Sequence, residues 1–266
     1  GTRMTATLMS DSLVFARRNI EHIRQIPEKL LDVTMQPVMF VLLFGFVFGG
    51  AINVHGNYRE YLIGGILIQS LAFGMMGPAM TINADLTEGV IDRFRSLPAA
   101  RGAYLIGHFL SELAGLGLSI VILTTTGFAV GWRTHASVLS VIGAFALLVL
   151  FASAVIWAGT WVGILVRSSD AVQGAMFTLV FPLTFLSNAF VPIASLPSWL
   201  QPVALWNPAS TMVAAVRHLF GNPEAPLVRH SWALDHAVVM SVIYCALILA
   251  LAVPAALRSY RVKTTD

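Results

Sequence analysis

The chain has 266 residues, of which 57% are hydrophobic and 11% are charged, whereas soluble domains carry about 25% charged residues. This composition excludes an ordinary water-soluble globule, because too few charged side chains are present to cover its surface, and it indicates that lipid is the solvent. The net charge of +3 comes from few and dispersed basic residues, which excludes nucleic-acid binding as the main function.

The N-terminal segment, residues 4–29, is predicted to be a cytoplasmic amphipathic helix, and residues 1–3 before Met4 are interpreted as a cloning remnant. Between residues 8 and 26 the apolar residues share one helical face and the charged residues occupy the other. This pattern favours a helix that lies on the inner membrane surface, although packing against a partner protein is an alternative. The apolar face comprises Leu8, Met9, Leu13, Phe15, Ala16, Ile20, Ile23 and Ile26.

Six runs of about 20 apolar residues predict six transmembrane helices. They span residues 30–52, 61–82, 104–130, 138–166, 171–189 and 233–257. Six spans place both termini on one side of the membrane, and 12 of the 16 Lys and Arg residues fall on that side. The positive-inside rule therefore predicts cytoplasmic termini, with residues 258–266 as a cytoplasmic tail, in the plasma (inner) membrane. Four tryptophans on the other side agree as interfacial anchors: Trp132, Trp199, Trp206 and Trp232.

The loop between the second and third spans contains a short amphipathic pattern, residues 85–97. Its apolar residues, Leu86, Val90, Phe94 and Leu97, form one stripe, while acidic residues open the segment and arginines close it. Pro98 ends the predicted helix. Such a helix is typical of a knob that docks into a groove on a partner, and the alternative is a helix lying on the membrane.

An outer segment, residues 190–220, is rich in proline and tryptophan but too apolar for a flexible linker. We predict two short helices in this region, over Ser198 to Leu205 and over Ala209 to Phe220. They would dip part-way into the bilayer as re-entrant helices, which is allowed where protein covers their irregular ends.

The chain lacks the common signatures of enzymatic chemistry. It has two lysines, Lys29 and Lys263, and neither lies in a phosphate-binding P-loop, so we expect no ATP binding of that kind. Signatures of zinc proteases and serine hydrolases are also missing, and the single cysteine, Cys245, offers no metal site. We therefore expect no catalytic residues, no cofactor and no metal in this chain.

Two groups of residues within the spans are candidates for function. Glu112 lies one helical turn after His108, so the two could form a gating or proton-exchanging pair, with a structural role as the main alternative. Arg217 and Asp32 lie near helix ends, where snorkelling to water is expected. Phenylalanines and methionines suit greasy ligands, but they suit core packing and lipid contact equally well. The tentative substrate path comprises Phe40, Phe44, Met75, Met76, Phe177, Phe181 and Phe185.

Two segments resemble the permease subunits of ABC-2-type exporters, particularly the daunorubicin/doxorubicin-resistance type of actinobacteria. The first contains Glu88-Gly89, then Asp92-Arg93-Phe94-Arg95-Ser96-Leu97-Pro98, then Arg101 and Gly107. The second, FPLTFLSNAFVPIASLPSWLQPVALWNP from Phe181 to Pro208 with Arg217 following, is similar to the family's fifth helix and outer hairpin. Its motif residues are Ser187, Pro192, Pro197, Trp199, Asn207 and Pro208.

The resemblance implies an all-α ABC-2 (type V) exporter fold that moves a hydrophobic or amphiphilic drug, antibiotic or lipid outward. It implies two permease subunits, identical or paralogous, and two P-loop ATPase subunits that bind ATP and Mg. The transport path would follow helices one, two and five. An ion-coupled secondary transporter is the alternative, since Glu112 hints at ion coupling. The implied ATPase-coupling residues are Leu86, Glu88, Gly89, Val90, Asp92, Arg93, Phe94, Arg95 and Leu97.

Overall fold

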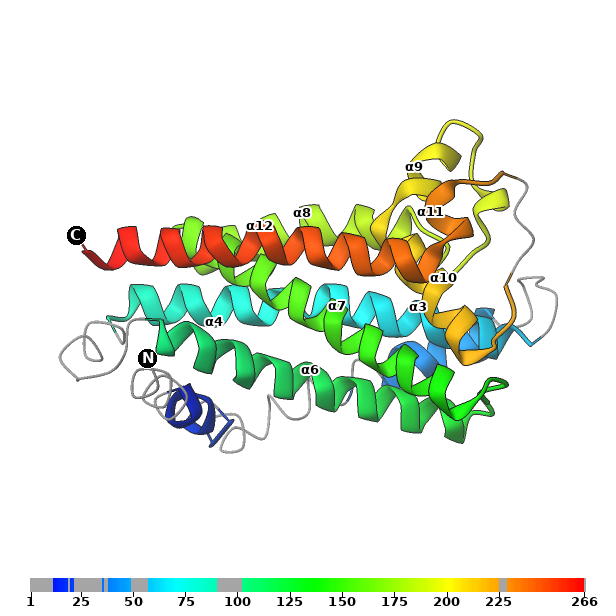
Figure 1. The fold of residues 1–266 in the computed structure, drawn as a ribbon, viewed down its shortest axis with the longest axis horizontal. Helices are drawn as coiled ribbons and strands as arrows, with labels where there is room; N and C mark the ends of the chain where they lie inside the picture. The colour runs from blue at the N-terminus through cyan, green and yellow to red at the C-terminus, as the bar shows by residue number, and fades with distance from the viewer. Residues whose placement is uncertain are drawn as a thin grey trace.

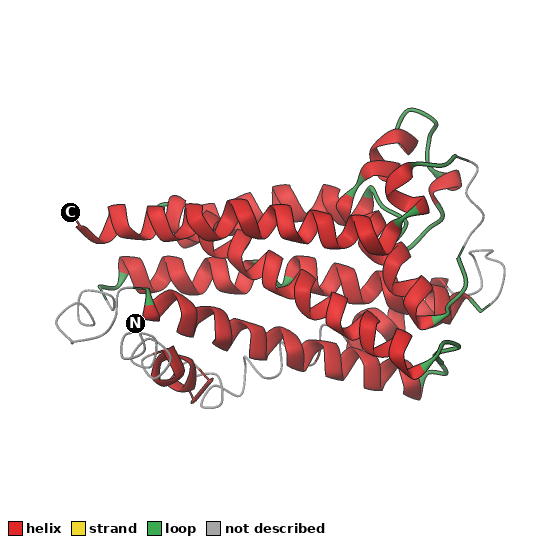
Figure 2. Ribbon diagram, viewed as in Figure 1, coloured by secondary structure: helices red, strands yellow, loops and turns green. Residues whose placement is uncertain are grey.

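The protein is a bundle of long helices that run side by side along its longest axis (Figure 1). The computed structural model describes residues 12–18, 20–21, 35, 38–48, 57–89, 102–224 and 229–265, and within these ranges it contains helices and no strand (Figure 2). Residues 12–18 and the C-terminal end of the last helix lie at one end of the bundle, here called the termini end (Figure 1). The short helices α9 and α11 lie at the opposite end, here called the α9–α11 end.

Each long helix, counting α3 and α4 together, runs from one end of the bundle to the other, and successive helices run in opposite directions (Figure 1). They are α3 (Tyr58–Phe73) with α4 (Met76–Thr87), α6 (Ala103–Ala129), α7 (Val138–Leu165), α8 (Ser169–Phe185) and α12 (Ala237–Thr265). The shorter elements are η1 (Leu43–Phe48), η2 (Ile193–Ser195), α9 (Gln201–Trp206), α10 (Pro208–Phe220) and α11 (Trp232–Asp235).

Among the described residues, four helices are long and apolar enough to cross a membrane: Tyr58–Thr87, Ala103–Ala129, Val138–Leu165 and Ala237–Thr264. They correspond to the second, third, fourth and sixth predicted spans. The predicted fifth span corresponds to α8, which has 17 residues and ends four residues earlier than expected. Helix α12 continues through Thr265, into the segment predicted as a cytoplasmic tail. Of the first predicted span, residue 35 and residues 38–48 are described, and both are helical, while the rest lies outside the described residues.

The second span is broken into α3 and α4 at Gly74 and Met75. Pro78 explains the position of this break, because a proline ring clashes with the carbonyl group four residues earlier, which here belongs to Gly74. Gly74 also packs closely on α6, where an added Cβ would overlap the side chain of Leu116. The break therefore combines a backbone constraint with a tight helix contact.

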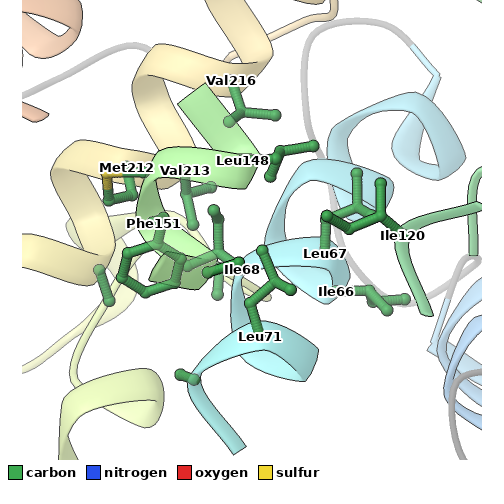
Figure 3. Close-up of a cluster of buried hydrophobic side chains, with 14 of the residues drawn as sticks. Ile66, Leu67, Ile68, Leu71, Ile120, Leu148, Phe151, Met212, Val213 and Val216 are labelled. Atoms are coloured by element: carbon green, nitrogen blue, oxygen red, sulfur yellow. The ribbon is translucent and has the colours of Figure 1, made fainter. Parts of the chain in front are cut away.

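The centre of the bundle is α7, which packs against α4, α6, α10 and α12. Two glycines on α7, Gly159 and Gly163, bring it very close to α4, since a Cβ at either would overlap the carbonyl oxygen of Met75 or Ala79. Small residues at such crossings are how membrane helices approach closely. The apolar core lies between α3, α6, α7 and α10, and Figure 3 shows it with Ile66, Leu67, Ile68, Leu71, Ile120, Leu148, Phe151, Met212, Val213 and Val216.

Helix ends are fixed by polar side chains that the sequence supplies at the correct positions. Ser137 and Ser168 each accept a hydrogen bond from a backbone N–H in the first turn of α7 and α8, respectively. Such N-caps satisfy amide groups that have no partner within the helix. At the other end of α7, the amide of Asn83 on α4 donates to the carbonyls of Gly163 and Val166, at 3.1 and 2.7 Å.

Candidate functional site

A fully buried arginine ties three distant segments together near the α9–α11 end. Arg217 of α10 has 0% exposure. Its Nε donates to the carbonyl oxygen of Tyr61 at 2.8 Å, and its Nη2 donates to the carbonyl oxygen of Ala189 at 3.0 Å. The guanidinium also lies 3.5 Å from the centroid of the Tyr61 ring. Arg217 therefore connects α10, α3 and the segment that follows α8.

The charge of Arg217 is balanced only weakly. The nearest carboxylate, that of Glu224, lies 3.9 Å from Nη1, and its side chain is 40% exposed. Burial raises the pKa of the Glu224 carboxyl, while the positive charges of Arg217 and His218 partly oppose this rise. Backbone carbonyls and an aromatic face thus carry most of the interaction. The prediction that Arg217 snorkels is wrong, since the guanidinium points into the bundle.

The same carbonyl-rich segment receives two tyrosine hydroxyls from α3. The hydroxyl of Tyr58 donates to the carbonyl oxygen of Phe190 at 3.1 Å, and that of Tyr61 donates to the carbonyl oxygen of Asn188 at 3.0 Å. A Cβ on Gly65 would overlap the carbonyl of Ala189, so the backbone of the segment rests directly on α3. The carbonyl oxygens of three consecutive residues, Asn188, Ala189 and Phe190, therefore each accept a hydrogen bond from a side chain far away in the sequence.

Asn207 joins the end of α8 to the beginning of α10. Its side-chain amide donates to the carbonyls of Leu183 and Leu186, at 2.7 and 2.8 Å, and its oxygen accepts from the N–H of Ala209 at 2.8 Å. One side chain thus caps the C-terminus of α8 and the N-terminus of α10. Pro208 follows at the first position of α10, where a missing N–H costs nothing.

The other predicted motif residues between α8 and α10 have local roles. Ser187 Oγ donates to the carbonyl of Thr184 and accepts from the N–H of Ala189. Pro192 precedes η2, and the carbonyl of Pro197 accepts from the N–H groups of Leu200 and Gln201. Trp199 is 75% exposed. The helix predicted over Ala209 to Phe220 is confirmed as α10, and the one predicted from Ser198 begins later, as α9.

The tryptophans near the α9–α11 end fall into two groups. Trp199, Trp206 and Trp232 are 75, 52 and 49% exposed, as interfacial anchors should be. Trp132 is fully buried, and its Nε1 donates to Asn222 at 2.8 Å. The prediction that Trp132 anchors the membrane surface is therefore wrong, because this indole is a hydrogen-bonded core residue.

Seven phenylalanines form a continuous chain of ring contacts, here called the aromatic array. Its members, in order of contact, are Phe40, Phe44, Phe190, Phe185, Phe181, Phe177 and Phe73. Successive ring centroids lie between 4.3 and 6.0 Å apart, within the range of favourable aromatic pairing. The three rings of α8 are spaced four residues apart and therefore share one helix face.

The aromatic array is partly open to its surroundings. Phe177, Phe181 and Phe185 are 52, 46 and 40% exposed, so their faces can contact a lipid chain or another molecule. One end of the array is Phe73, next to the break between α3 and α4. Phe190, in the segment held by Tyr58, links the rings of α8 to Phe44 and Phe40. It joins five of the predicted path residues, and it adds Phe73 and Phe190, which lie outside the predicted path.

The two methionines of the predicted path lie elsewhere. Met75 is 5% exposed and packs against Gly159 of α7, and Met76 packs against the same apolar core. Neither methionine is therefore part of the aromatic array, and Met75 packs against α7 at the break that follows Phe73.

His108 and Glu112 do not form the predicted pair. His108 is buried, and its Nε2 lies 3.0 Å from Thr160 Oγ1 of α7, while Nδ1 has no hydrogen-bond partner among the described residues. Glu112 lies on α6 with its carboxylate close to Gly77 of α4. His108 is therefore part of the contact between α6 and α7, and gating by the pair loses its geometric basis.

The predicted coupling segment is described only at its beginning. Leu86 lies in the last turn of α4, Glu88 follows as its C-cap, and Gly89 adopts a left-handed φ of 68°. The prediction of a separate helix that begins at Asp85 is therefore wrong for its first residues, which belong to α4. The remaining predicted coupling residues, Val90, Asp92, Arg93, Phe94, Arg95 and Leu97, lie outside the described residues.

The described part of the N-terminal segment is helical from residue 12 to residue 18. Its apolar face is divided, because Phe15 and Ala16 are buried while Leu13 and Ile20 are 61 and 39% exposed. Phe15 packs against Gly107 of α6, where a Cβ would overlap it. The helix is therefore seated on the bundle by one part of its apolar face and leaves the other part available to lipid.

Within the part of the chain that the structure describes, no group of three or more His, Cys, Asp or Glu residues is placed to hold a metal ion. The arrangement instead offers buried polar contacts at the two ends and an aromatic surface between them. It can bind an apolar or aromatic compound by stacking and dispersion.

Comparison with known proteins gives a consistent result. Residues 12–220 match the model of the family described as "ABC-2 type transporter". The chain is 29% identical to a daunorubicin resistance ABC transporter permease protein of Streptomyces coeruleorubidus, over 80% of this chain and 76% of that protein. It is 28% identical to a doxorubicin resistance ABC transporter permease protein of Mycobacterium tuberculosis, over 77 and 74%. A putative transport permease of Cyanophora paradoxa is 24% identical, over 80 and 75%.

Proposed function

The chain belongs to the ABC-2 type transporter family, and we propose that it is the permease subunit of an ATP-driven exporter that moves a hydrophobic or amphiphilic drug outward. It is an integral membrane protein, since the described part of the chain alone contains four helices long and apolar enough to span the bilayer. Six spans, cytoplasmic termini and a location in the plasma membrane complete the proposal, with the distribution of Lys and Arg as support.

The aromatic array is the observation that carries the proposal. Its exposed rings on α8 present flat apolar faces, and aromatic pairs contribute about 0.5–1.5 kcal/mol each beyond their area burial. A compound with fused aromatic rings would gain from several such contacts as it moves along the array. The similarity to permeases named for daunorubicin and doxorubicin resistance supports a drug rather than a lipid as substrate.

The motor is proposed to be a separate polypeptide. The sequence has no P-loop, so two P-loop ATPase subunits would bind ATP and Mg and would act on two permease subunits through residues 86–97. ATP hydrolysis would then drive the movement of substrate from the inner leaflet outward. The second permease subunit would be another copy of this chain or a paralogue.

The proposal is tested by transport in proteoliposomes that contain the chain together with a candidate P-loop ATPase partner from the same organism, with daunorubicin as the probe. We expect transport that requires ATP and persists when a protonophore collapses the proton gradient. Transport that needs the gradient and ignores ATP would instead favour a secondary transporter.

The same transport assay also tests whether the aromatic array contacts the substrate. Phe181→Leu removes a ring but keeps an apolar side chain, so we expect the apparent substrate affinity to fall about threefold to tenfold while basal ATP hydrolysis is retained. Phe128→Leu is the matched control, because Phe128 is 42% exposed on α6 and lies outside the array. Equal affinities for the two variants would remove the array from the proposed path.

A further inference from the structure

At the termini end, α4 and α6 are joined across the base of the segment between them. The hydroxyl of Tyr104, in the first turn of α6, donates to the carboxylate of Asp85, in the last turn of α4. Tyr104 is 4% exposed, so this charge-assisted bond is shielded from water. One hydrogen bond therefore joins the last turn of α4 to the first turn of α6.

The ring of Tyr104 contacts three further side chains. Phe15 of the N-terminal helix meets it edge to face, with centroids 5.8 Å apart. Tyr260 of α12 stacks on it at 5.9 Å with an interplanar angle of 6°, and His108 lies one turn along α6 at 6.3 Å. Tyr104 thus touches the N-terminal helix and the end of α12, in addition to α4.

Asp85 receives a second interaction from the N-terminal helix. Nη2 of Arg18 lies 3.8 Å from the carboxylate, and the two side chains are 38 and 17% exposed. At this distance and exposure an ion pair is worth little by itself. It does, however, place a positive charge near the carboxylate that accepts the hydrogen bond from Tyr104. The N-terminal helix and α6 therefore both interact with Asp85 of α4.

We propose that Tyr104 and Asp85 are positioning residues for energy coupling: their hydrogen bond makes the ends of α4 and α6 move together when the ATPase pushes on residues 86–97. The inference rests on the proposed function, because it needs a partner that acts on this segment. Without the bond, a force on residues 86–97 would move the ends of α4 and α6 apart instead of moving both helices together. The contacts with Phe15 and Tyr260 would carry the same displacement to the N-terminal helix and α12.

The test uses the permease–ATPase complex in proteoliposomes and measures the number of substrate molecules transported per ATP hydrolysed. Tyr104→Phe removes only the hydroxyl, and we expect this ratio to fall about threefold to tenfold while the complex still assembles and hydrolyses ATP. Tyr244→Phe is the matched control, because it removes a tyrosine hydroxyl that donates to the carbonyl of Trp206 at the α9–α11 end. We expect it to leave the ratio unchanged.

Substitutions at Asp85 separate the hydrogen bond from the charge. Asp85→Asn keeps an acceptor for Tyr104 but loses the charge, so it should retain most of the coupling, whereas Asp85→Ala should match Tyr104→Phe. A normal ratio in Tyr104→Phe would overturn the inference. So would a defect confined to Asp85→Asn and Arg18→Gln, since the ion pair would then be responsible.

The proposed function and the positioning role of Tyr104 and Asp85 can fail separately. If the wild-type complex transports without ATP or does not bind an ATPase, the proposed function fails. If the wild type couples transport to ATP and Tyr104→Phe does so equally well, only the positioning role fails. Loss of assembly in both Tyr104→Phe and Asp85→Ala would show that the pair is needed for folding, and this result would also overturn a role in coupling.

Discussion

Replacing Arg217 tests whether the buried guanidinium holds the α9–α11 end together. Arg217→Met keeps the length of the side chain but removes two charge-assisted hydrogen bonds, to the carbonyls of Tyr61 and Ala189, and the contact with the Tyr61 ring. Hydrogen bonds to charged groups contribute about 1.5–3 kcal/mol each, and a desolvated cation–π contact contributes about 2 kcal/mol. The gross loss in stabilisation is therefore large.

Part of that loss is recovered, because the variant no longer buries a charge whose partner Glu224 is distant and half-exposed. Burying an ion costs several kcal/mol, so the two effects oppose each other. We expect the polar contacts to win, and the free energy of unfolding to fall by about 2–4 kcal/mol in Arg217→Met. Arg217→Lys should be no better, because it keeps the buried charge while losing the planar fork that reaches both carbonyls.

The assay is unfolding of the purified protein in mixed micelles, followed by tryptophan fluorescence. Arg133→Met is a matched control, because Arg133 also donates to two backbone carbonyls and lies 5.9 Å from an aromatic centroid, yet its side chain is exposed. We expect this control to change stability by less than about 1 kcal/mol. The reasoning is refuted if Arg217→Lys matches the wild type, or if Arg217→Met and Arg133→Met behave alike.

Two further substitutions test the same region with the same assay. Gly65→Ala should lower the free energy of unfolding by about 2 kcal/mol or more, because the new methyl group overlaps the backbone of Ala189, which cannot yield as a side chain would. Gly115→Ala is its control, since a Cβ there meets nothing, and it should be neutral or stabilising by up to about 1 kcal/mol. Asn207→Ala should cost about 2–4 kcal/mol, because three hydrogen bonds and two helix caps are lost, whereas Ser137→Ala removes one cap and should cost about 1 kcal/mol. Equal losses in these last two variants would contradict the double capping role.

The sequence predicts the long helices well because lipid imposes one requirement on all of them. Each span must satisfy its backbone internally and remain apolar over about 20 residues, so hydropathy alone locates it. Helix ends are less predictable. The break after Phe73 is set by Pro78 together with the tight contact at Gly74, and the second of these depends on Leu116, which is far away in the sequence.

The candidate site is predictable only in part, for a physical reason. The spacing of Phe177, Phe181 and Phe185 is local and shows a shared face, but the contact of Phe185 with Phe190 and of Phe190 with Phe44 depends on how distant segments fold together. Arg217 illustrates the same limit. A long basic side chain near a helix end usually reaches water, and only the arrangement of α3 beside α10 reveals the carbonyls that it binds.

The residues that sequence analysis misplaced are mostly polar, and the membrane explains why they matter. In lipid, burial of apolar surface does not drive one helix toward another, since lipid chains are as apolar as leucine. Close approach at Gly159 and Gly163 provides packing, but packing between smooth apolar faces leaves the helices able to slide. Directional bonds must then fix their positions, and the described structure places such bonds at the two ends of the bundle, through Arg217 at one and Tyr104 at the other. In a chain with so few charged residues, a small number of buried polar groups therefore fix the helices relative to one another.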